Sequence, residues 1–264
     1  MKLFILNNEP NKNDTIKLEK NDYHYLVNVR RLAVGEFFPA LLPNGEETQV
    51  QILSIEHGVL TVKCTPPCPR VNSFENLPPI ILFQALPKSD KMDLIVRQAA
   101  EGGITEIVPF VSEFSVARFN AAGQKFLRWE RIIKEAKQQS GSKIATILRP
   151  PFTMNELLNY WNDLKKNGAL GLLFHHLGLE HESLHRYLSN NPGTAAVPVA
   201  APVVYVIGPE GGFSDKEVSC FMENGFKPLT IGNTVLRTET AALYCAAAIR
   251  ILLLERNSWE LKQA

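Results

Sequence analysis

The sequence predicts an α/β protein in which a small β-barrel precedes a larger domain built on a parallel sheet. Because the barrel is added to the α/β domain, the chain as a whole is classed as α+β. From Met1 to Cys64, short strands alternate with tight turns, as in small all-β modules. After Ile80, fully apolar runs recur between helical stretches, which is the pattern of parallel strands covered on both faces.

A proline-rich segment separates the two regions. Thr65–Pro79 holds five prolines in fifteen residues, a density that neither a central strand nor a helix tolerates. We therefore expect an N-terminal domain at residues 1–70 and a second domain at residues 71–264, joined by a linker at about 65–79.

Several segments of the first region have the composition of strands. Asn44-Gly45 and His57-Gly58 lie between them as turn dipeptides that accept a positive φ. The predicted strands are Lys2–Leu6, Thr15–Glu19, Phe37–Leu42, Thr48–Ile55 and Val59–Cys64. One helix at Asp22–Leu32 interrupts this set, with Asn21 or Asp22 placed to cap it.

The second region alternates buried strands with helices. The predicted strands are Ile80–Leu86, Glu106–Val111, Ala169–His176, Val203–Gly208 and Pro228–Gly232. The predicted helices are Ser89–Gly103, Gln124–Gly141, Met154–Gly168, Ser214–Gly225 and Thr238–Glu255. Ser89 is placed to cap the first helix and Gly102-Gly103 to stop it, whereas Pro192–Pro202 reads as an irregular connection.

Composition limits the class of protein. The chain has 264 residues, 45% hydrophobic and 21% charged, which is typical of a soluble globular protein. Its net charge of +1 argues against bulk positive charge as the means of binding nucleic acid, but Asn76–Pro150 carries 11 basic and 7 acidic residues. No apolar run is long enough to span a bilayer, and four scattered cysteines make no disulfide framework. We expect a cytoplasmic protein with neither a membrane nor a DNA partner.

The strongest local motif is a glycine-rich turn between a buried strand and a helix. Gly208-Pro209-Glu210-Gly211-Gly212 follows the strand, and Ser214 and Glu217 have the spacing of a capping box. Glycines at the carboxyl end of a strand let a ligand approach the backbone N–H groups. The turn is neither a Walker loop nor GxGxxG, and a purely structural turn remains an alternative.

A second polar cluster begins the last helix. Arg237, Thr238, Glu239 and Thr240 crowd its N-terminus, which fits either simple capping or a ligand site. The alanine-rich face that follows would allow close packing within the chain or across a dimer.

Together these motifs resemble a known family. IGPEGGFS followed by IGNTVLRTETA is similar to the RsmE-type small-subunit (16S) ribosomal RNA uridine-N3-methyltransferases of the SPOUT superfamily. HYLVNVRR, KSDKMDLIVRQAAEGGITEIVPFVSEFSV and RWERIIKEAKQQSG agree as well, so the resemblance covers nearly the whole chain. The chain departs from the family's usual residues at Gln98, Gly102, Phe114 and Ser142.

The resemblance implies a PUA-like N-terminal β-barrel, a SPOUT domain with a C-terminal trefoil knot, a homodimer, and S-adenosyl-L-methionine held in the knot loops. The residues it assigns to cofactor binding are Leu172, Leu173, Phe174, Gly208, Pro209, Glu210, Gly211, Gly212, Ile231, Gly232, Asn233, Val235, Leu236 and Thr238. The expected partner is ribosomal RNA or the small ribosomal subunit.

Methylation of uridine N3 requires removal of the N3 proton and stabilisation of the developing negative charge. Arg237 is the candidate for stabilising that charge, and Glu239 for orienting Arg237 or accepting a proton, with helix capping as the alternative for both. The candidates for phosphate contacts are Arg30, Arg31, Lys88, Lys91, Arg97 and Lys143.

Other interpretations remain open at this point. His181–His185 reads HExxH, the zincin motif, but no third ligand follows at a suitable spacing, and Cys64 and Cys68 lack a second ligand pair, so no metal is expected. The same fold could methylate another RNA atom. A non-enzymatic RNA-binding assembly factor is the alternative from a different class.

Overall fold

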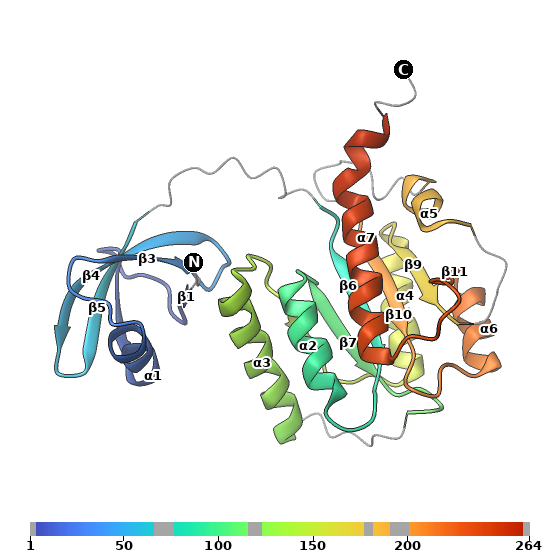
Figure 1. Cartoon of the computed structure of the whole chain (residues 1–264), viewed down its shortest axis with the longest axis horizontal. Coiled ribbons are helices and arrows are strands. Elements are labelled where there is room, and N and C mark those ends of the chain that lie inside the picture. The colour runs from blue at the N-terminus through green and yellow to red at the C-terminus, as the bar shows by residue number, and fades with distance from the viewer. Residues whose placement is uncertain (1–3, 66–76, 116–122, 177–181, 191–200, 261–264) are drawn as a thin grey trace. The chain divides into compact units, whose positions relative to one another are not determined.

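The computed structural model describes residues 4–65, 77–115, 123–176, 182–190 and 201–260, with side chains through residue 255. The chain divides into two compact units, Met1–Val71 with Lys134–Ala145, and Asn72–Ile133 with Thr146–Ala264 (Figure 1). Most of the predicted linker and of the irregular connection at Pro192–Pro202 lies outside the described residues.

The first unit contains a curled five-stranded sheet with the order β1-β3-β4-β5-β2. The strands are β1 (Phe4–Ile5), β2 (Thr15–Glu19), β3 (Phe37–Leu41), β4 (Glu47–Glu56) and β5 (Val59–Thr65). All pairs are antiparallel except β1 with β3. Alternate residues face a core that includes Phe38, Val50 and Val62, which confirms the predicted period-2 strands. The two edge strands, β1 and β2, do not pair with each other among the described residues, so the described sheet is a half-barrel.

The helix of this unit differs from the prediction. It begins directly after β2 as α1 (Lys20–Tyr23) and continues as a π-helix (His24–Val29). Glu19 is the N-cap residue and makes no side-chain capping bond, so the expected cap at Asn21 or Asp22 is wrong. Both residues already lie within the first turn, because the chain turns at Lys20 with a φ of 53° and leaves no connecting residues.

The second unit confirms the predicted parallel sheet. Its order is β11-β9-β10-β6-β7-β8, and every pairing is parallel. The strands are β6 (Ile80–Ala85), β7 (Glu106–Phe110), β8 (Ile147–Leu148), β9 (Leu170–Phe174), β10 (Val203–Ile207) and β11 (Lys227–Leu229). Every residue of β6, β7 and β10 is buried, as strands covered on both faces require.

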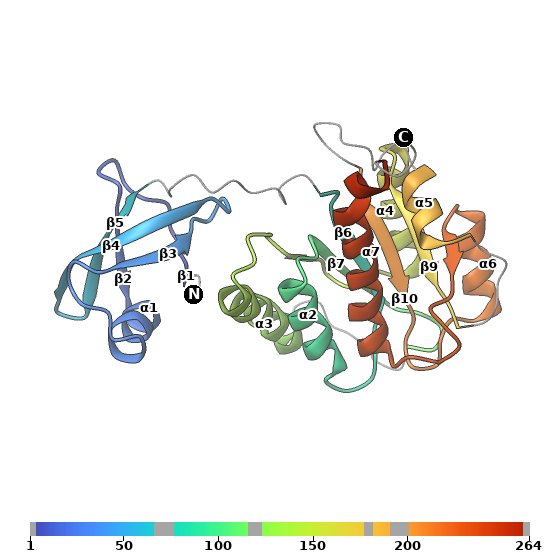
Figure 2. The ribbon, with the colours of Figure 1, turned by 45° about the horizontal axis from the view of Figure 1, so that its top comes forward.

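Helices cover both faces of this sheet (Figure 2). The helices that follow β6 are α2 (Lys91–Glu101), α3 (Gln124–Ser140), α4 (Met154–Lys166), α5 (Leu184–Asn190), α6 (Asp215–Glu223) and α7 (Thr238–Glu260). Residues 134–140 of α3 belong to the first unit. Side chains of α4 and α6, including Trp161 and Phe221, form one core with Phe83 and Val206. The trefoil knot stays a prediction.

Three details of the second unit differ from the sequence prediction. The N-cap of α2 is Asp90, and Ser89 adopts a φ of 58°, so Ser89 does not cap the helix. The expected stop at Gly102 is confirmed. Strand β8 and helix α5 were not predicted, because a two-residue edge strand and a short polar helix carry little apolar periodicity.

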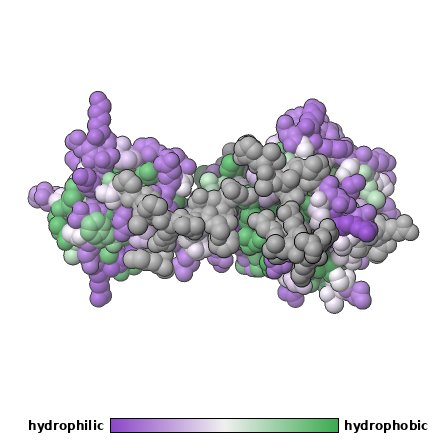
Figure 3. Space-filling model, turned by 90° about the horizontal axis from the view of Figure 1, so that it is seen from above, coloured by the Kyte–Doolittle hydropathy of each residue, from purple (hydrophilic) through white to green (hydrophobic). Residues whose placement is uncertain are grey.

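In the view from above, hydrophilic residues predominate among the coloured atoms, and hydrophobic residues show in smaller patches on both units (Figure 3). None of the described helices combines the length and apolarity needed to span a membrane.

Candidate functional site

The glycine-rich turn lies at the carboxyl end of β10 and leads into α6. Helix α6 begins with the predicted capping box, in which the Ser214 hydroxyl accepts from the Glu217 N–H and the Glu217 carboxylate accepts from the Ser214 N–H. The second Glu217 carboxylate oxygen accepts from the Glu113 N–H at 2.9 Å. Glu217 is only 7% exposed, and its hydrogen bonds satisfy the buried carboxylate. Through these bonds it connects the start of α6 with the loop after β7.

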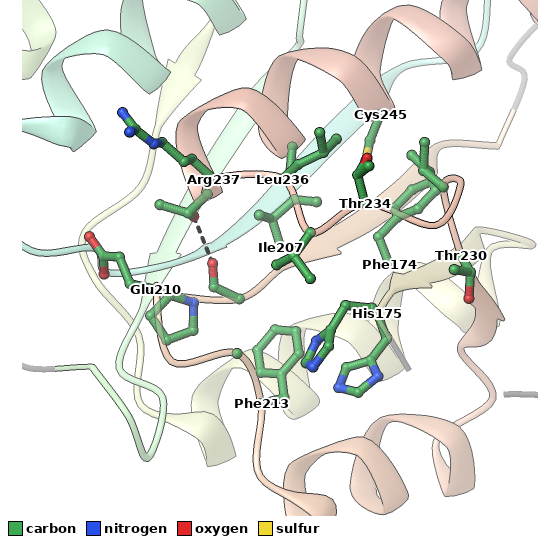
Figure 4. Close-up of a pocket in the computed structure, with 18 of the residues that line it drawn as sticks. Phe174, His175, Ile207, Glu210, Phe213, Thr230, Thr234, Leu236, Arg237 and Cys245 are labelled. Carbon is green, nitrogen blue, oxygen red and sulfur yellow. Dashed lines mark hydrogen bonds between the residues drawn. The ribbon is translucent and has the colours of Figure 1, made fainter. Parts of the chain in front are cut away.

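The start of α7 lies next to this turn. The hydroxyl of Thr238 donates a hydrogen bond to the Gly208 carbonyl at 2.7 Å, drawn as the dashed line in Figure 4. Thr238 is 4% exposed. The loop after β11 therefore returns to the end of β10, and the two predicted motifs form one site.

A cavity of about 410 Å³ lies between these segments. Its volume is within the range of small-molecule sites, and its position at the carboxyl ends of parallel strands is where α/β sheets bind ligands. The lining residues are Lys91, Phe174, His175, His176, Ile207, Gly208, Pro209, Glu210, Gly211, Gly212, Phe213, Thr230, Ile231, Gly232, Thr234, Val235, Leu236, Arg237, Thr238, Ala241 and Cys245. Figure 4 shows Arg237 and Glu210 at one end of the cavity and Phe174 and Thr230 at the other.

The glycines of the turn are required by close packing and by backbone conformation. A Cβ on Gly208 would lie 3.3 Å from the Phe213 ring, and a Cβ on Gly211 would lie 3.0 Å from the Cβ of Phe114. Gly212 has a φ of 72°, which favours glycine. The turn therefore presents bare backbone to the cavity, as a site for a nucleoside-like ligand requires.

A cluster of charges closes the Arg237 end of the cavity. The Lys91 ammonium lies 2.8 Å from a carboxylate oxygen of Glu210 and 3.7 Å from one of Glu239. The backbone N–H of Lys88 also donates to the Glu210 carboxylate, at 3.1 and 3.2 Å.

These contacts change two pKa values in opposite directions. Burial acts to raise the pKa of Glu210, but the hydrogen bonds from Lys91 and from the backbone outweigh it, and the pKa is lowered. The hydrogen bond to Glu210 raises the pKa of Lys91. The pair is therefore charged throughout the neutral range.

Most of the predicted cofactor-binding residues lie at this cavity. Leu172 and Leu173 are instead fully buried in β9, and Asn233 is exposed and is not among the lining residues. The remaining eleven are Phe174, Gly208, Pro209, Glu210, Gly211, Gly212, Ile231, Gly232, Val235, Leu236 and Thr238.

The two predicted catalytic residues lie at the same end of the site. Arg237 lines the cavity, whereas Glu239 does not and is instead in contact with Lys91. One carboxylate oxygen of Glu239 is buried and has no hydrogen-bond partner among the described residues.

The predicted phosphate-binding residues are not gathered in one place. Lys91 lines the cavity, and Lys88 and Arg97 are exposed on the second unit. The guanidinium of Arg30 lies over the Phe38 ring in the first unit, at 5.7 Å from the centroid, and Arg31 is exposed there. Lys143 forms an ion pair with Glu47 at 3.3 Å.

Sequence reasoning did not select several lining residues. These are His175, His176, Ile207, Phe213, Thr230, Thr234, Ala241 and Cys245. Ala241 and Cys245 follow Thr238 at helical spacings of three and seven, so the helical period could have identified them. The two histidines directly follow β9, and their position at the carboxyl end of a parallel strand could have identified them as site residues.

The motifs considered for metal binding do not assemble in the part of the chain that the structure describes. His181 and Cys68 lie outside the described residues, and His185 lies in α5. Cys64 is buried in β5. No group of three or more metal-ligating side chains occurs among the residues described.

Comparisons with protein families cover both units. The model of an RNA methyltransferase domain matches residues 75–250, and that of an RNA methyltransferase PUA domain matches residues 18–63.

Full-length relatives agree with these matches. Ribosomal RNA small subunit methyltransferase E of Synechocystis sp. is 31% identical over 242 residues, which cover 90% of this chain and 74% of that protein. Ribosomal RNA small subunit methyltransferase E 2 of Borreliella burgdorferi is 30% identical over 244 residues, covering 89% of this chain and 90% of that protein.

A solved structure is similar throughout its length. The crystal structure of ribosomal RNA small subunit methyltransferase E from Neisseria gonorrhoeae, bound to S-adenosyl methionine, superposes with a TM-score of 0.78 at 25% identity. The similarity covers 96% of this chain and 98% of that one.

Proposed function

The chain belongs to the family of RNA methyltransferases, and from this premise we propose that it methylates N3 of a uridine in small-subunit (16S) ribosomal RNA. The observation that carries the proposal is the single cavity formed by the glycine-rich turn and the start of α7, in a chain similar over 90% of its length to a small-subunit methyltransferase.

The residues present fit S-adenosylmethionine. Bare backbone at Gly208–Gly212 suits the polar edges of a nucleoside, and Phe174, Ile207 and Leu236 provide apolar walls. When bound, this cofactor supplies a methyl group activated by a sulfonium centre. The protein's part is to hold the target base in line and to manage the N3 proton and charge.

Arg237 and Glu239 have the chemistry that this reaction needs. Arg237 carries a permanent positive charge at the cavity and could stabilise the negative charge that develops on the uracil. Glu239 lies beside Arg237 in sequence but does not line the cavity, and its buried carboxylate oxygen, which accepts no hydrogen bond among the described residues, lies 3.7 Å from the Lys91 ammonium; it is the candidate for orienting Arg237 or for accepting the N3 proton.

Ribosomal RNA as substrate also accounts for the first unit. A match to the PUA domain of RNA methyltransferases at residues 18–63 favours an RNA-binding role for it. Arg31 on this unit and Lys88 and Arg97 on the second are exposed and available for phosphate contacts. A ribosomal substrate favours the cytoplasm as the compartment.

We also propose a homodimer formed through α7. Among the side chains of this helix described through residue 255, four large apolar ones are exposed, Leu243, Tyr244, Ile251 and Leu254. Leu243, Ile251 and Leu254 fall on one face at helical spacing, and such a stripe favours a protein partner. A second copy of the chain fits, because self-complementary helical faces pair by two-fold symmetry. We expect wild-type protein to sediment as a dimer and Ile251→Glu as a monomer; a monomeric wild type would refute this proposal.

Methyl transfer to unmodified small subunits tests the proposed reaction. Purified protein is incubated with small ribosomal subunits from cells that lack the modification and with cofactor carrying a labelled methyl group. We expect label in the RNA and 3-methyluridine after nucleoside mass spectrometry. Label on another nucleoside would exclude uridine N3, and cofactor binding by calorimetry without any transfer would favour a non-enzymatic assembly factor.

A further inference from the structure

A polar side chain lies in the centre of the parallel sheet, away from the cavity surface. Gln84 is on β6, between β10 and β7, and is 0% exposed. The five other residues of β6 are apolar. A buried amide must recover in hydrogen bonds what it loses in hydration, so its partners indicate its role.

The Gln84 amide nitrogen has two acceptors. It donates to the Ala85 carbonyl at 2.9 Å and to the Thr238 hydroxyl at 3.0 Å. The Thr238 hydroxyl donates its own proton to the Gly208 carbonyl at 2.7 Å, so it can only accept from Gln84. The carbonyl oxygens of Ala85 and Gly208 therefore determine that the NH2 end of the Gln84 amide, and not its oxygen, faces Thr238.

The other end of the amide shows that this orientation has a cost. The Gln84 amide oxygen is buried and has no hydrogen-bond partner among the described residues. An apolar residue would avoid this penalty, and the rest of β6 consists of such residues. An apolar residue could supply neither hydrogen bond of Gln84, and of the two only the bond to Thr238 leads out of β6.

The hydrogen bonds connect three segments that are distant in the sequence. Gln84 belongs to β6 and Gly208 to the glycine-rich turn, and Thr238 is the first residue of α7. Gly208 and Thr238 both line the cavity, whereas Gln84 does not. We propose that Gln84 is a positioning residue, which acts through Thr238 to fix the spacing between the two walls of the site and thereby the affinity for S-adenosylmethionine. This inference rests on the proposed function.

A second buried hydrogen bond between the sheet and α7 serves as a matched control. The Tyr205 hydroxyl of β10 donates to the Ala242 carbonyl at 3.1 Å. This bond also ties a buried strand residue to α7 but does not involve the glycine-rich turn or a lining residue, and phenylalanine at position 205 keeps the ring that packs against Phe174. Tyr205→Phe therefore removes a comparable bond without disturbing the spacing of the two walls.

Calorimetry with S-adenosylmethionine on the full-length protein tests the proposal. In Gln84→Met, which keeps the volume but removes the donor, we expect the Kd to rise about tenfold, the value of one lost hydrogen bond. We expect kcat at saturating cofactor to change less than about threefold, because Gln84 touches no reacting group. Tyr205→Phe should lower the melting temperature with the Kd unchanged.

The same hydrogen bonds are tested independently from the α7 side. Thr238→Val should weaken cofactor binding, Thr238→Ser should restore it, and adding Gln84→Met to Thr238→Val should cause no further loss. If Gln84→Met does not fold, Gln84→Leu replaces it in both experiments, since it also removes the donor to Thr238.

Two results would overturn the inference. One is a wild-type Kd in folded Gln84→Met; the other is an equal rise in Kd in Tyr205→Phe, which would show a general effect of destabilising α7. Failure of the wild-type protein itself to bind S-adenosylmethionine would count against the proposed function instead.

Discussion

The ammonium group of Lys91, at the start of α2, lies 2.8 Å from the carboxylate of Glu210 in the glycine-rich turn. The same ammonium is 3.7 Å from Glu239 at the start of α7. One side chain thus connects three separate segments at the mouth of the cavity. The contact of Lys91 with RNA phosphates stays a prediction, whereas its position shows that it joins the segments of the site.

Removal of the Lys91 charge should loosen the cavity. Lys91→Met removes the ion pair with Glu210. Of the described contacts between Glu210 and α2 or the loop before it, only the hydrogen bond from the backbone N–H of Lys88 is then left. We expect the Kd for S-adenosylmethionine, measured by calorimetry, to rise about three- to tenfold. Lys88→Met is the matched control, because its contact with Glu210 comes from the backbone, and its cofactor affinity should not change. Equal effects of the two substitutions would contradict this role.

The stability that this ion pair contributes should depend on pH at both extremes. The pKa of Glu210 is lowered from 4.5, so its contribution is present above 4.5 and is lost as the pH falls through the lower folded value. The pKa of Lys91 is raised from 10.5, so its contribution is present below 10.5 and is lost as the pH rises through the higher folded value. We expect the difference in unfolding free energy between wild type and Glu210→Gln to be flat between these limits and to shrink outside them. A difference that varies across neutral pH would show that another group titrates.

Arg237 should affect turnover more than cofactor binding. Arg237→Ala removes an exposed positive charge that lines the cavity, and no described hydrogen bond or ion pair of the fold depends on it. We expect kcat for methyl transfer to fall about 10²- to 10³-fold while the Kd for S-adenosylmethionine changes little. Arg237→Lys should recover part of the rate. Parallel loss of binding and rate in Arg237→Ala would instead indicate a structural role.

A side chain at Gly211 should distort the glycine-rich turn. In Gly211→Ala the new Cβ would lie 3.0 Å from the Cβ of Phe114, which belongs to the loop after β7. We expect the cofactor Kd to rise about three- to tenfold, because either the turn or the loop must move. Phe114→Gly should restore part of the affinity in the double variant, since it removes the atom that collides. Wild-type binding by Gly211→Ala would show that the contact is adaptable.

The far side of the sheet offers a test of stability alone. The Tyr160 hydroxyl donates to Glu106 at 2.8 Å, and Arg149 shares the same carboxylate oxygen. Tyr160→Phe should lower the free energy of unfolding by about 1 kcal/mol and leave cofactor affinity unchanged. Burial and the hydrogen bond to Glu106 raise the pKa of Tyr160 from 10.0 to about 12, so wild type should lose stability as the pH rises from 10 to 12. Denaturant titrations over this range should show a smaller loss in the variant.

Local patterns were sufficient to predict much of the fold and part of the site. The apolar runs at β6, β10 and β7 predicted a parallel sheet because a strand buried on both faces needs no polar alternation. Ser214 and Glu217 predicted the start of α6, because a capping box involves residues only three positions apart.

Elements whose geometry depends on distant packing were predicted less well. The helix after β2 begins without connecting residues at Lys20 and widens into a π-helix, and neither feature follows from its residues. Serine is a common N-cap residue, but Ser89 has a φ of 58°, and Asp90 occupies the cap position instead. Strand β8 exists because its two residues can pair with β7, which periodicity over two residues cannot indicate.

The sequence alone therefore determined which segments are buried and where ligand-accepting turns occur, since hydrophobic period and turn chemistry act over a few residues. Only the tertiary structure decided which of those segments meet. Gln84 and Thr238 are separated by 154 positions and share a hydrogen bond, and Lys91 joins Glu210 to Glu239 across α2, the glycine-rich turn and α7. Such pairings arise when strands and helices pack into layers, and the polar groups then brought together determine the shape and charge of the site.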